Sequence, residues 1–280
     1  VEGLGMASYF NSKFLGELPS SEPRVFGDRI FAEIVVAKFM CTHLLSIMGY
    51  DFLFQDVDIV WYKDPMAFFN DPKLADPEID IFFQDDINGQ IRYQPLRGNS
   101  GFYYVRNNVR TRAAFKDAVM RTDQLFVSRS HQQTLLEVLS EHISYHGLRV
   151  KTFDADDTTW FPNGGHFLIR PTFMKDFIAG KLKDVYLFHM NWTGNKKVKL
   201  AYLKQMGEWF VRDTCTNRPL KKTLEEHSNL TQGLSGNFSI GHVCCSREPL
   251  FSCHYRDKPS IRECKSSPSL DGKNGTKSWW

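Results

Sequence analysis

The chain has 280 residues, an apolar content of 42% and a formal net charge of +3 at pH 7. That apolar fraction is enough for a packed core and excludes an intrinsically disordered chain. The 35 basic residues nearly balance the 32 acidic ones, so the chain lacks the electrostatic footprint of a nucleic-acid-binding protein.

The predicted elements follow an irregular start, residues 1–27, that is rich in Gly, Ser and Pro. The first is a long apolar helix at 28–48, with Asp28 in its N-cap region and Gly49 as its stop. Strands are then predicted at 51–54, 79–83, 101–105 and 185–190, and further helices at 111–127, 131–146 and 199–212. Strands that alternate with helices indicate an α/β fold with a largely parallel sheet.

After residue 212 the sequence becomes rich in Ser, Gly, Pro, Asn and Cys, so we expect one domain at 1–212 and a tail at 213–280. Five of the six cysteines lie in the tail: Cys215, Cys244, Cys245, Cys253 and Cys264. We expect at least two disulfides among them, because the alternative of a zinc site lacks a Cys-x-x-Cys pair. Four Asn-x-Ser/Thr sequons add weight to a lumenal location: Asn191, Asn229, Asn237 and Asn274.

No signal peptide or uninterrupted membrane span is visible in the sequence. The best candidate span, residues 30–50, is interrupted by Glu33, Lys38 and His43. The chain begins with Val1 rather than Met, and no opening strand is recognisable before the first helix. We therefore expect further sequence upstream, including a membrane anchor.

The most informative motif is FLFQDVDIVWYKDP, residues 52–65. Asp56 and Asp58 directly follow an apolar strand, which is where open α/β sheets bind ligands. Two carboxylates offer hard oxygen ligands to a divalent cation, and such a cation typically bridges substrate phosphates. The alternative is a solvated acidic turn. A second Asp-x-Asp, Asp154 and Asp156, falls in a predicted loop and carries less weight.

A phosphatase of the haloacid-dehalogenase type is a rival interpretation, because it also places Asp-x-Asp after an apolar strand. Asp85 and Asp86 mimic the second acidic motif of such enzymes. Only residues 59–84 separate Asp58 from Asp85, however, and these 26 residues are too few for the helices, hydroxyl motif and lysine which that chemistry needs. The spacing therefore disfavours a phosphatase.

Four segments, in this order, carry a resemblance to a known family: FGDRIFAEIVVAK, FLFQDVDIVWYKDP, NSGFYYVRNN and FPNGGHF. They resemble the nucleotide-diphospho-sugar transferases, which include plant rhamnogalacturonan xylosyltransferases and extensin arabinosyltransferases, over roughly residues 25–212. The resemblance implies a GT-A (Rossmann-like) fold, a nucleotide-sugar donor, Mn²⁺ or Mg²⁺ as cofactor, and transfer with retention at the anomeric carbon. In one departure, family members often carry Asp-Gln where this chain has His131-Gln132-Gln133, which leaves the role of residue 131 open.

Several residues are candidates for binding the donor. Lys38, in the middle of the first helix's apolar face, either extends to the rim or reaches the donor's phosphate or sugar. Asn99 and Ser100 open a strand and are suited to bind sugar hydroxyls, while Gly101 permits close backbone approach. We expect Asp56 to contact the donor as well as the metal.

The segment HMNWTGNKK, which follows the strand at 185–190, offers further candidates. His189 is a candidate third metal ligand, and an imidazole would favour Mn²⁺ over Mg²⁺. We expect its strand to deliver it to the same sheet edge as Asp56 and Asp58. The alternative is a structural histidine in the core. Gly194 and Lys196 are candidates for contacts to the diphosphate.

The resulting functional hypothesis is a glycosyltransferase that moves a pentose, such as xylose or arabinose, or galactose to a glycan or glycoprotein. The donor is expected to be a UDP-sugar. Asp85, Asp86 and Gln132 are the candidate catalytic residues, and none of them is singled out as nucleophile. The resemblance implies a Golgi type II protein, held at the membrane only through an upstream anchor.

Two alternatives belong to other classes of protein. The first is a non-catalytic lumenal protein that binds a sugar or nucleotide on the same fold, and intact Asp56 and Asp58 argue against it. The second is a structural, disulfide-rich surface protein, which leaves the acidic residues at the strand ends without a role.

Overall fold

A computed structural model describes residues 12–15, 19, 27–87, 90–153, 160–216 and 244–250. The chain forms two compact units, one of residues 11–195 and one of residues 1–10 together with 196–280. The larger unit contains the candidate site. The division by packing falls at residue 195, whereas the sequence boundary at residue 212 stays a prediction.

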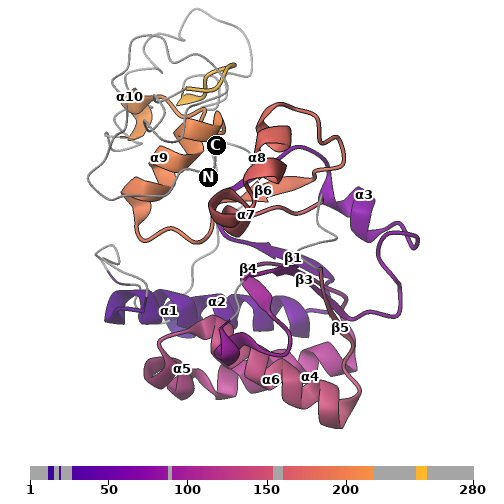
Figure 1. Ribbon diagram of the computed structural model, residues 1–280. Coiled ribbons are helices and arrows are strands. Elements are labelled where there is room, and N and C mark those ends of the chain that lie inside the picture. Colours follow the sequence, from indigo (N-terminus) through magenta and orange to yellow (C-terminus); the bar gives the residue numbers. More distant parts are fainter. Residues whose placement is uncertain are drawn as a thin grey trace, which may run out of the picture. The chain divides into compact units, whose positions relative to one another are not determined.

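The larger unit is built on a four-stranded sheet in the order β1-β4-β3-β5 (Figure 1). Its strands are β1 (Phe52–Gln55), β3 (Ile81–Asp85), β4 (Gly98–Val105) and β5 (Val150–Thr152). β3 pairs parallel with β5, and β4 pairs antiparallel with both β1 and β3. Three of the four strands therefore run in the same direction, as expected. The insertion of β4 between β1 and β3 nevertheless makes the pairing mixed, which the sequence did not predict.

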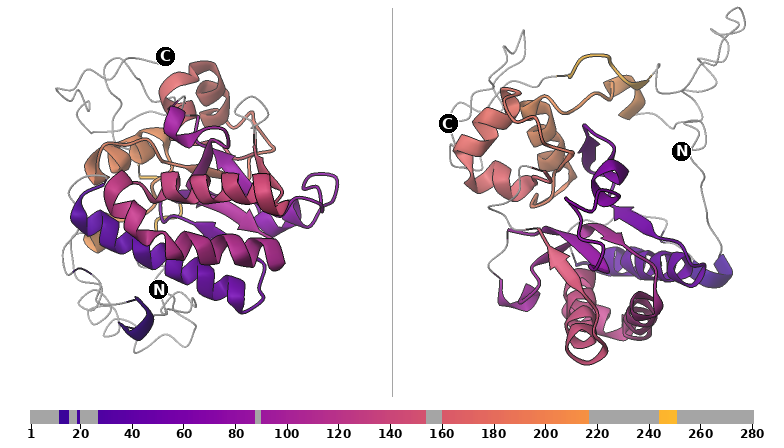
Figure 2. Two further views of the ribbon diagram at one scale, coloured as in Figure 1. Left: turned by 90° about the horizontal axis from the view of Figure 1, so that it is seen from below. Right: turned by 90° about the vertical axis from the view of Figure 1, so that its right-hand side faces the viewer.

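Helices cover one face of this sheet, as the view from below shows (Figure 2). They are α2 (Arg29–Ile47), α4 (Val109–Met120), α5 (Thr122–Ser128) and α6 (His131–His146). Their apolar residues, including Val35, Phe39, Phe115 and Leu139, form one core cluster with Phe83 of β3. The predicted helix at 111–127 is therefore two helices, whereas the helix predicted at 131–146 has the bounds of α6.

A second core lies on the opposite face of the sheet. It combines α3 (Pro65–Phe69) with a separate two-stranded sheet of β2 (Ile59–Trp61) and β6 (Leu187–His189). Phe82 belongs to this cluster and its neighbour Phe83 to the first one, because side chains alternate between the two faces of a strand. The helices α7 (Gly164–Ile169) and α8 (Pro171–Ile178) follow on this side, and the short pieces α1 (Ser12–Leu15) and η2 (Ile91–Tyr93) complete the unit.

The helix α2 has the capping that the sequence predicted. The Asp28 side chain accepts a hydrogen bond from Phe31 N at 2.8 Å, and Gly49, at φ +87°, follows the last turn. Among the described helices, α2 alone is long and apolar enough to cross a membrane by length and composition. In the structure it serves as a core helix, because five of its residues are buried: Ala32, Val35, Phe39, Thr42 and Ser46.

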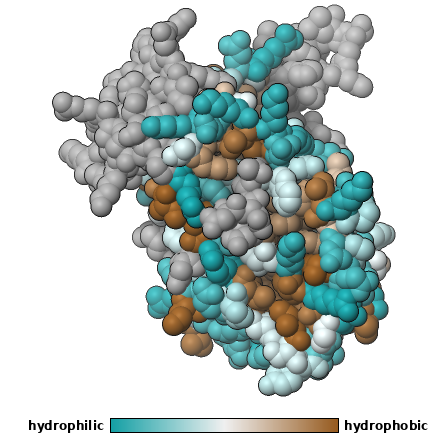
Figure 3. Space-filling view, turned by 45° about the vertical axis from the view of Figure 1, so that its right-hand side comes forward, coloured by the Kyte–Doolittle hydropathy of each residue, from teal (hydrophilic) through white to brown (hydrophobic). Residues whose placement is uncertain are grey.

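On the face drawn in Figure 3, hydrophobic residues are interspersed with hydrophilic ones. Exposed apolar residues are nevertheless present in the larger unit, among them Met48, Val57 and Val127. Single exposed apolar side chains are normal on protein surfaces and do not by themselves mark a binding face.

The smaller unit contains α9 (Lys196–Met206) and α10 (Asp213–Thr216). The helix expected at 199–212 ends early, because Gly207 adopts a left-handed φ of +79° directly after α9. Cys215 and Cys244 form a disulfide, while Cys245 and Cys41 are free thiols in the described part of the chain. Cys253, Cys264 and the sequons at Asn229, Asn237 and Asn274 lie outside the described residues, so the expectation of a second disulfide stays a prediction.

Candidate active site

Asp56 and Asp58 lie on the loop that joins β1 to β2. Asp56 N donates to Gly101 O at 2.7 Å, which extends the β1–β4 pairing by one residue, and Met190 N donates to Asp58 O at 3.0 Å. The Asp58 side chain is 11% exposed and that of Asp56 39%. The backbone of the Asp-x-Asp loop is therefore held by two different sheets, while the Asp56 carboxylate is open to solvent.

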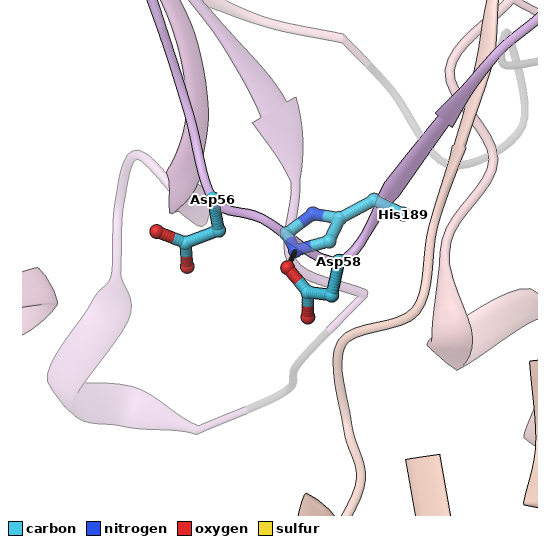
Figure 4. Close-up of side chains that lie close together, drawn as sticks. All are labelled: Asp56, Asp58 and His189. Carbon is cyan, nitrogen blue, oxygen red and sulfur yellow. Dashed lines mark ion pairs between the residues drawn. The ribbon is translucent and has the colours of Figure 1, made fainter. Parts of the chain in front are cut away.

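His189 lies against this loop (Figure 4). Its Nε2 is 3.3 Å from Asp58 Oδ1, and the ligand atoms of Asp56, Asp58 and His189 all lie within 4.8 Å of one another. The expected proximity of His189 to Asp58 is thus present, but its expected origin is wrong. β6 does not join the main sheet; it pairs antiparallel with β2, and Ile59 faces His189 in that ladder. Because Ile59 directly follows Asp58, this pairing brings the His189 imidazole beside the Asp58 side chain.

Lys38 pairs with a carboxylate of the candidate site, and its expected contact with the donor stays a prediction. Its Nζ donates to Asp56 Oδ1 at 2.7 Å and lies 4.9 Å from the centre of the Phe54 ring. The Lys38 side chain is only 18% exposed, and Asp56, the first acid of the Asp-x-Asp motif, balances the positive charge of this largely buried lysine. The helix α2 thereby supplies a positive charge directly beside the candidate metal ligands.

The Asn99-Ser100-Gly101 segment reaches this site because β4 runs antiparallel to β1 and β3. The start of β4 therefore lies beside the ends of both neighbours, with Gln55 opposite Phe102 and Asp85 opposite Gly98. A Cβ on Gly101 would lie 2.7 Å from both Asp56 Oδ2 and His189 Cε1. Any side chain at residue 101 would therefore force the acidic or imidazole side chains to shift, because they occupy the space beside this glycine.

The two adjacent acids at the end of β3 differ in their surroundings, although both are buried. Asp85 accepts from Arg97 Nη2 at 3.3 Å and from the Ile87 backbone N–H. Asp86 accepts from Asn99 Nδ2 at 2.5 Å and from Gln132 Nε2 at 3.1 Å. Asp86 therefore belongs to a polar network with other candidate site residues, whereas Asp85 pairs with Arg97 and with the backbone of its own turn.

This network continues through Ser100 to α6. Ser100 N donates to Gln132 Oε1 at 3.1 Å, and Ser100 Oγ lies 2.8 Å from His131 Nε2. Burial lowers the pKa of His131 well below its usual value, and the positive charge of Lys38 adds to this effect. His131 is therefore neutral at physiological pH. Residue 131 thus places a neutral ring beside the Ser100 hydroxyl.

The remaining donor-binding candidates are Gly194 and Lys196. Gly194 is exposed, with no described atom within 4 Å of the position that a Cβ would take. Lys196 is the first residue of α9 and belongs to the smaller unit. Their contact with a diphosphate stays a prediction.

Three residues that frame the site escaped the sequence reasoning. Gln84 accepts from His189 Nδ1, Trp192 Nε1 donates to Asp86 O at 2.8 Å, and Asn163 Nδ2 donates to Asp85 O at 2.6 Å. Trp192 also has a left-handed φ of +60°, which is rare for a bulky residue and is found preferentially at functional sites. Two of these residues lie in motifs discussed above, Asn163 in FPNGGHF and Trp192 in HMNWTGNKK, but neither residue was assigned a role.

An open depression of about 430 Å³ lies beside the Asp-x-Asp loop. Its lining comes from β1, β2 and the start of α3, with Leu53, Gln55, Trp61, Lys63, Asp64 and Pro65. It is wide rather than enclosed, unlike the pockets that bury most of a small ligand.

The mixed α/β sheet, with polar groups gathered where β1 and β3 end and β4 begins, is consistent with the GT-A fold of nucleotide-sugar transferases. Comparison with known proteins makes this specific. Residues 5–203 match the model of the nucleotide-diphospho-sugar transferase family, and the chain belongs to that family. Family membership removes the phosphatase alternative and confirms the resemblance carried by the four motifs.

Two relatives of the chain are named for the sugars that they transfer. The chain is 25% identical over 194 residues to the β-arabinofuranosyltransferase RAY1 of Arabidopsis thaliana, covering 66% of this chain and 35% of that protein. It is 24% identical over 213 residues to the UDP-galactose:fucoside α-3-galactosyltransferase of Dictyostelium discoideum, covering 69% of this chain and 30% of the relative. The matched segment thus spans about a third of each relative. No solved structure matches the chain significantly.

Proposed function

We propose that the chain is the catalytic domain of a glycosyltransferase that uses a UDP-sugar and a divalent cation, Mn²⁺ or Mg²⁺. The observation that carries the proposal is the convergence of Asp56, Asp58 and His189, whose ligand atoms lie within 4.8 Å of one another. Two carboxylates and an imidazole form a suitable donor set for such a cation, and Mn²⁺ accepts the imidazole more readily than Mg²⁺. The glycine at residue 101 leaves room for the side chains that would hold the ion.

The bound cation would neutralise the departing diphosphate, which is the main electrostatic demand of the reaction. Lys38 would add a second positive charge, since its ammonium group already lies beside Asp56. Gly194 and Lys196 are the further candidates for contacts to the diphosphate, through the backbone and through charge.

For the transferred sugar, we propose binding by the network of Asp86, Asn99 and Gln132. Asn99 joins this network to the metal ligands, because its Nδ2 donates to Asp86 and its Oδ1 accepts from Gly101 N at 2.7 Å. Retention through a covalent intermediate would need a nucleophile on the face of the sugar opposite the leaving diphosphate. Asp85, Asp86 and Gln132 remain the candidates, and Asp86 and Gln132 belong to the same network as Asn99.

The relatives supply the candidates for the sugar. One is named for the transfer of arabinofuranose and the other for the transfer of galactose from UDP-galactose. We therefore propose a pentose or galactose as the transferred group and a glycan or glycoprotein as acceptor. The disulfide in the smaller unit agrees with a lumenal location in the secretory pathway, and a Golgi type II protein is the proposal.

A donor screen tests the function. The chain is incubated with UDP-arabinose, UDP-xylose, UDP-galactose and a GDP-sugar, with Mn²⁺ or with EDTA, and the release of nucleoside diphosphate is measured. We expect release from at least one UDP-sugar with Mn²⁺, and none with EDTA or with the Asp58→Asn variant. Tight binding of a UDP-sugar without turnover would instead support the non-catalytic alternative.

A further inference from the structure

The buried amide of Gln84 has only one possible orientation. Gln84 is the fourth residue of β3 and is 0% exposed. Its Nε2 lies 2.8 Å from Phe161 O and 3.3 Å from Pro162 O. Carbonyl oxygens only accept hydrogen bonds, so the NH₂ group must face them and Oε1 must point the other way.

That orientation dictates which nitrogen of His189 carries a proton. Gln84 Oε1 lies 2.7 Å from His189 Nδ1, and an amide oxygen can only accept. Nδ1 is therefore the protonated nitrogen, and in a neutral imidazole Nε2 keeps its lone pair. This Nε2 is the atom that lies 3.3 Å from Asp58 Oδ1. Two lone-pair atoms at this distance can share a divalent cation, or a proton when the ring is charged.

We infer that Gln84 is a positioning residue, which holds His189 in the Nδ1–H tautomer so that Nε2 faces a divalent cation beside Asp58. The inference rests on the proposed metal centre and deepens it. A metal-binding histidine commonly donates its other N–H to an oxygen acceptor that orients the ring, and here an uncharged amide provides that acceptor.

The segment that holds Gln84 also holds the backbone of β6. His189 N donates to Pro162 O at 3.1 Å, which is the same carbonyl that accepts from Gln84. Asn163 forms an isolated parallel bridge with His189. One short stretch of chain, residues 161–163, therefore positions both the backbone of His189 and, through Gln84, its ring. This stretch is the FPN of the FPNGGHF motif.

The first measurement is the tautomer of His189 in the metal-free chain, by ¹⁵N–¹H correlation spectroscopy of the imidazoles with His189→Gln for assignment. In the neutral ring of the wild type we expect the proton on Nδ1. In Gln84→Met, which fills similar space without an acceptor, we expect a mixture of tautomers. A neutral wild-type ring protonated on Nε2 would overturn the inference, and this result needs no variant of Gln84 to fold.

The second measurement is Mn²⁺ affinity, from the electron paramagnetic resonance signal of the free ion. We expect Gln84→Met to bind Mn²⁺ about 10–100-fold more weakly than the wild type. Gln84→Glu keeps an oxygen acceptor for Nδ1 and should bind more tightly than Gln84→Met. The matched control is Gln133→Met, which removes a surface amide bonded to Glu137 and should leave affinity unchanged.

A double-mutant cycle separates an effect of Gln84 that acts through His189 from a general disruption of the site. If Gln84 acts through His189, Gln84→Met should cost no further Mn²⁺ affinity in a His189→Ala background. An equal loss in both backgrounds would overturn the inference. If the wild type binds no Mn²⁺, the proposed metal centre fails, and the tautomer measurement still decides whether Gln84 holds the ring.

Discussion

Lys38 Nζ lies 2.7 Å from Asp56 Oδ1, so a lysine from the longest described helix of the larger unit neutralises the first acid of the Asp-x-Asp motif. The Lys38 side chain is only 18% exposed, so Asp56 balances a largely buried charge. We propose that the pair also places a positive charge where the metal and the diphosphate would meet.

Replacement of Lys38 should separate binding of the metal from binding of the donor. In Lys38→Met we expect Mn²⁺ alone to bind at least as tightly as in the wild type, because a repelling charge is gone. The KM for the UDP-sugar should rise about tenfold through the loss of one charge-assisted hydrogen bond. Calorimetry and steady-state kinetics measure the two effects, and an unchanged KM would restrict Lys38 to a structural role.

The glycines of β4 allow the same substitution to test the site and the core separately. In Gly101→Ala the new methyl group would displace Asp56 and His189, and we expect kcat/KM to fall about 100-fold, as small misplacements of catalytic groups do. In Gly98→Ala the methyl group would meet the Phe83 ring at 2.7 Å. That variant should instead lose about 1–3 kcal/mol of stability by overpacking.

Thermal melts and Mn²⁺ titrations of both glycine variants check this contrast. If residue 101 borders the metal site, Gly101→Ala should lose more metal affinity than Gly98→Ala. Equal metal affinities in the two variants would show that residue 101 is not part of the site.

Buried His131 should make the fold sensitive to acid. Burial, with the charge of Lys38, lowers the pKa of His131 in the folded chain, so the unfolded chain binds a proton near pH 6.5 that the folded chain does not. Stability from this group is therefore fully present above about pH 6.5 and falls below it, with a slope of up to about 1.4 kcal/mol per pH unit.

Urea unfolding between pH 5 and pH 8 measures that slope. We expect His131→Gln to flatten the curve below pH 6.5. Burial also lowers the pKa of His43, with a contribution from the charge of Lys116. The His43→Gln variant is therefore measured as well, to separate the contribution of this second histidine to the slope. Identical slopes in wild type and His131→Gln would contradict the assignment of a buried, neutral His131.

The sequon at Asn191 should remain without a glycan in the folded chain. Its Nδ2, where a glycan attaches, is buried without a hydrogen-bond partner among the described residues, and its Oδ1 accepts from Gly164 N at 2.8 Å. A sugar on Nδ2 would therefore prevent the local packing. Glycopeptide mass spectrometry of active protein from a lumenal expression host should find Asn191 unmodified, and substantial occupancy there would refute this.

Local signals were enough to predict much of the fold. Asp28 and Gly49 marked the ends of α2, and the apolar period of residues 131–146 gave the bounds of α6, because caps and periodicity depend only on nearby residues. The direction of β4 was not predictable in this way. Strand order is set by contacts between distant segments, and that order brings Asn99 beside Asp86.

In the candidate site, too, only the features set by nearby residues were predictable from the sequence. Asp56 and Asp58 follow a strand in the sequence, so their chemistry was visible. Gln84 was not, because a single glutamine in an apolar strand has no distinctive local pattern, and its role depends on Phe161 and His189, far along the chain.

The most direct test of the central claim is anomalous diffraction from crystals of the chain soaked in Mn²⁺ and UDP. We expect one strong manganese peak within coordination distance of the Asp58 carboxylate and His189 Nε2, with Asp56 in the same cluster, and its loss in Asp58→Asn crystals. A saturating soak that leaves this cluster empty while manganese binds elsewhere would contradict the account of a metal-dependent glycosyltransferase centred on these three residues.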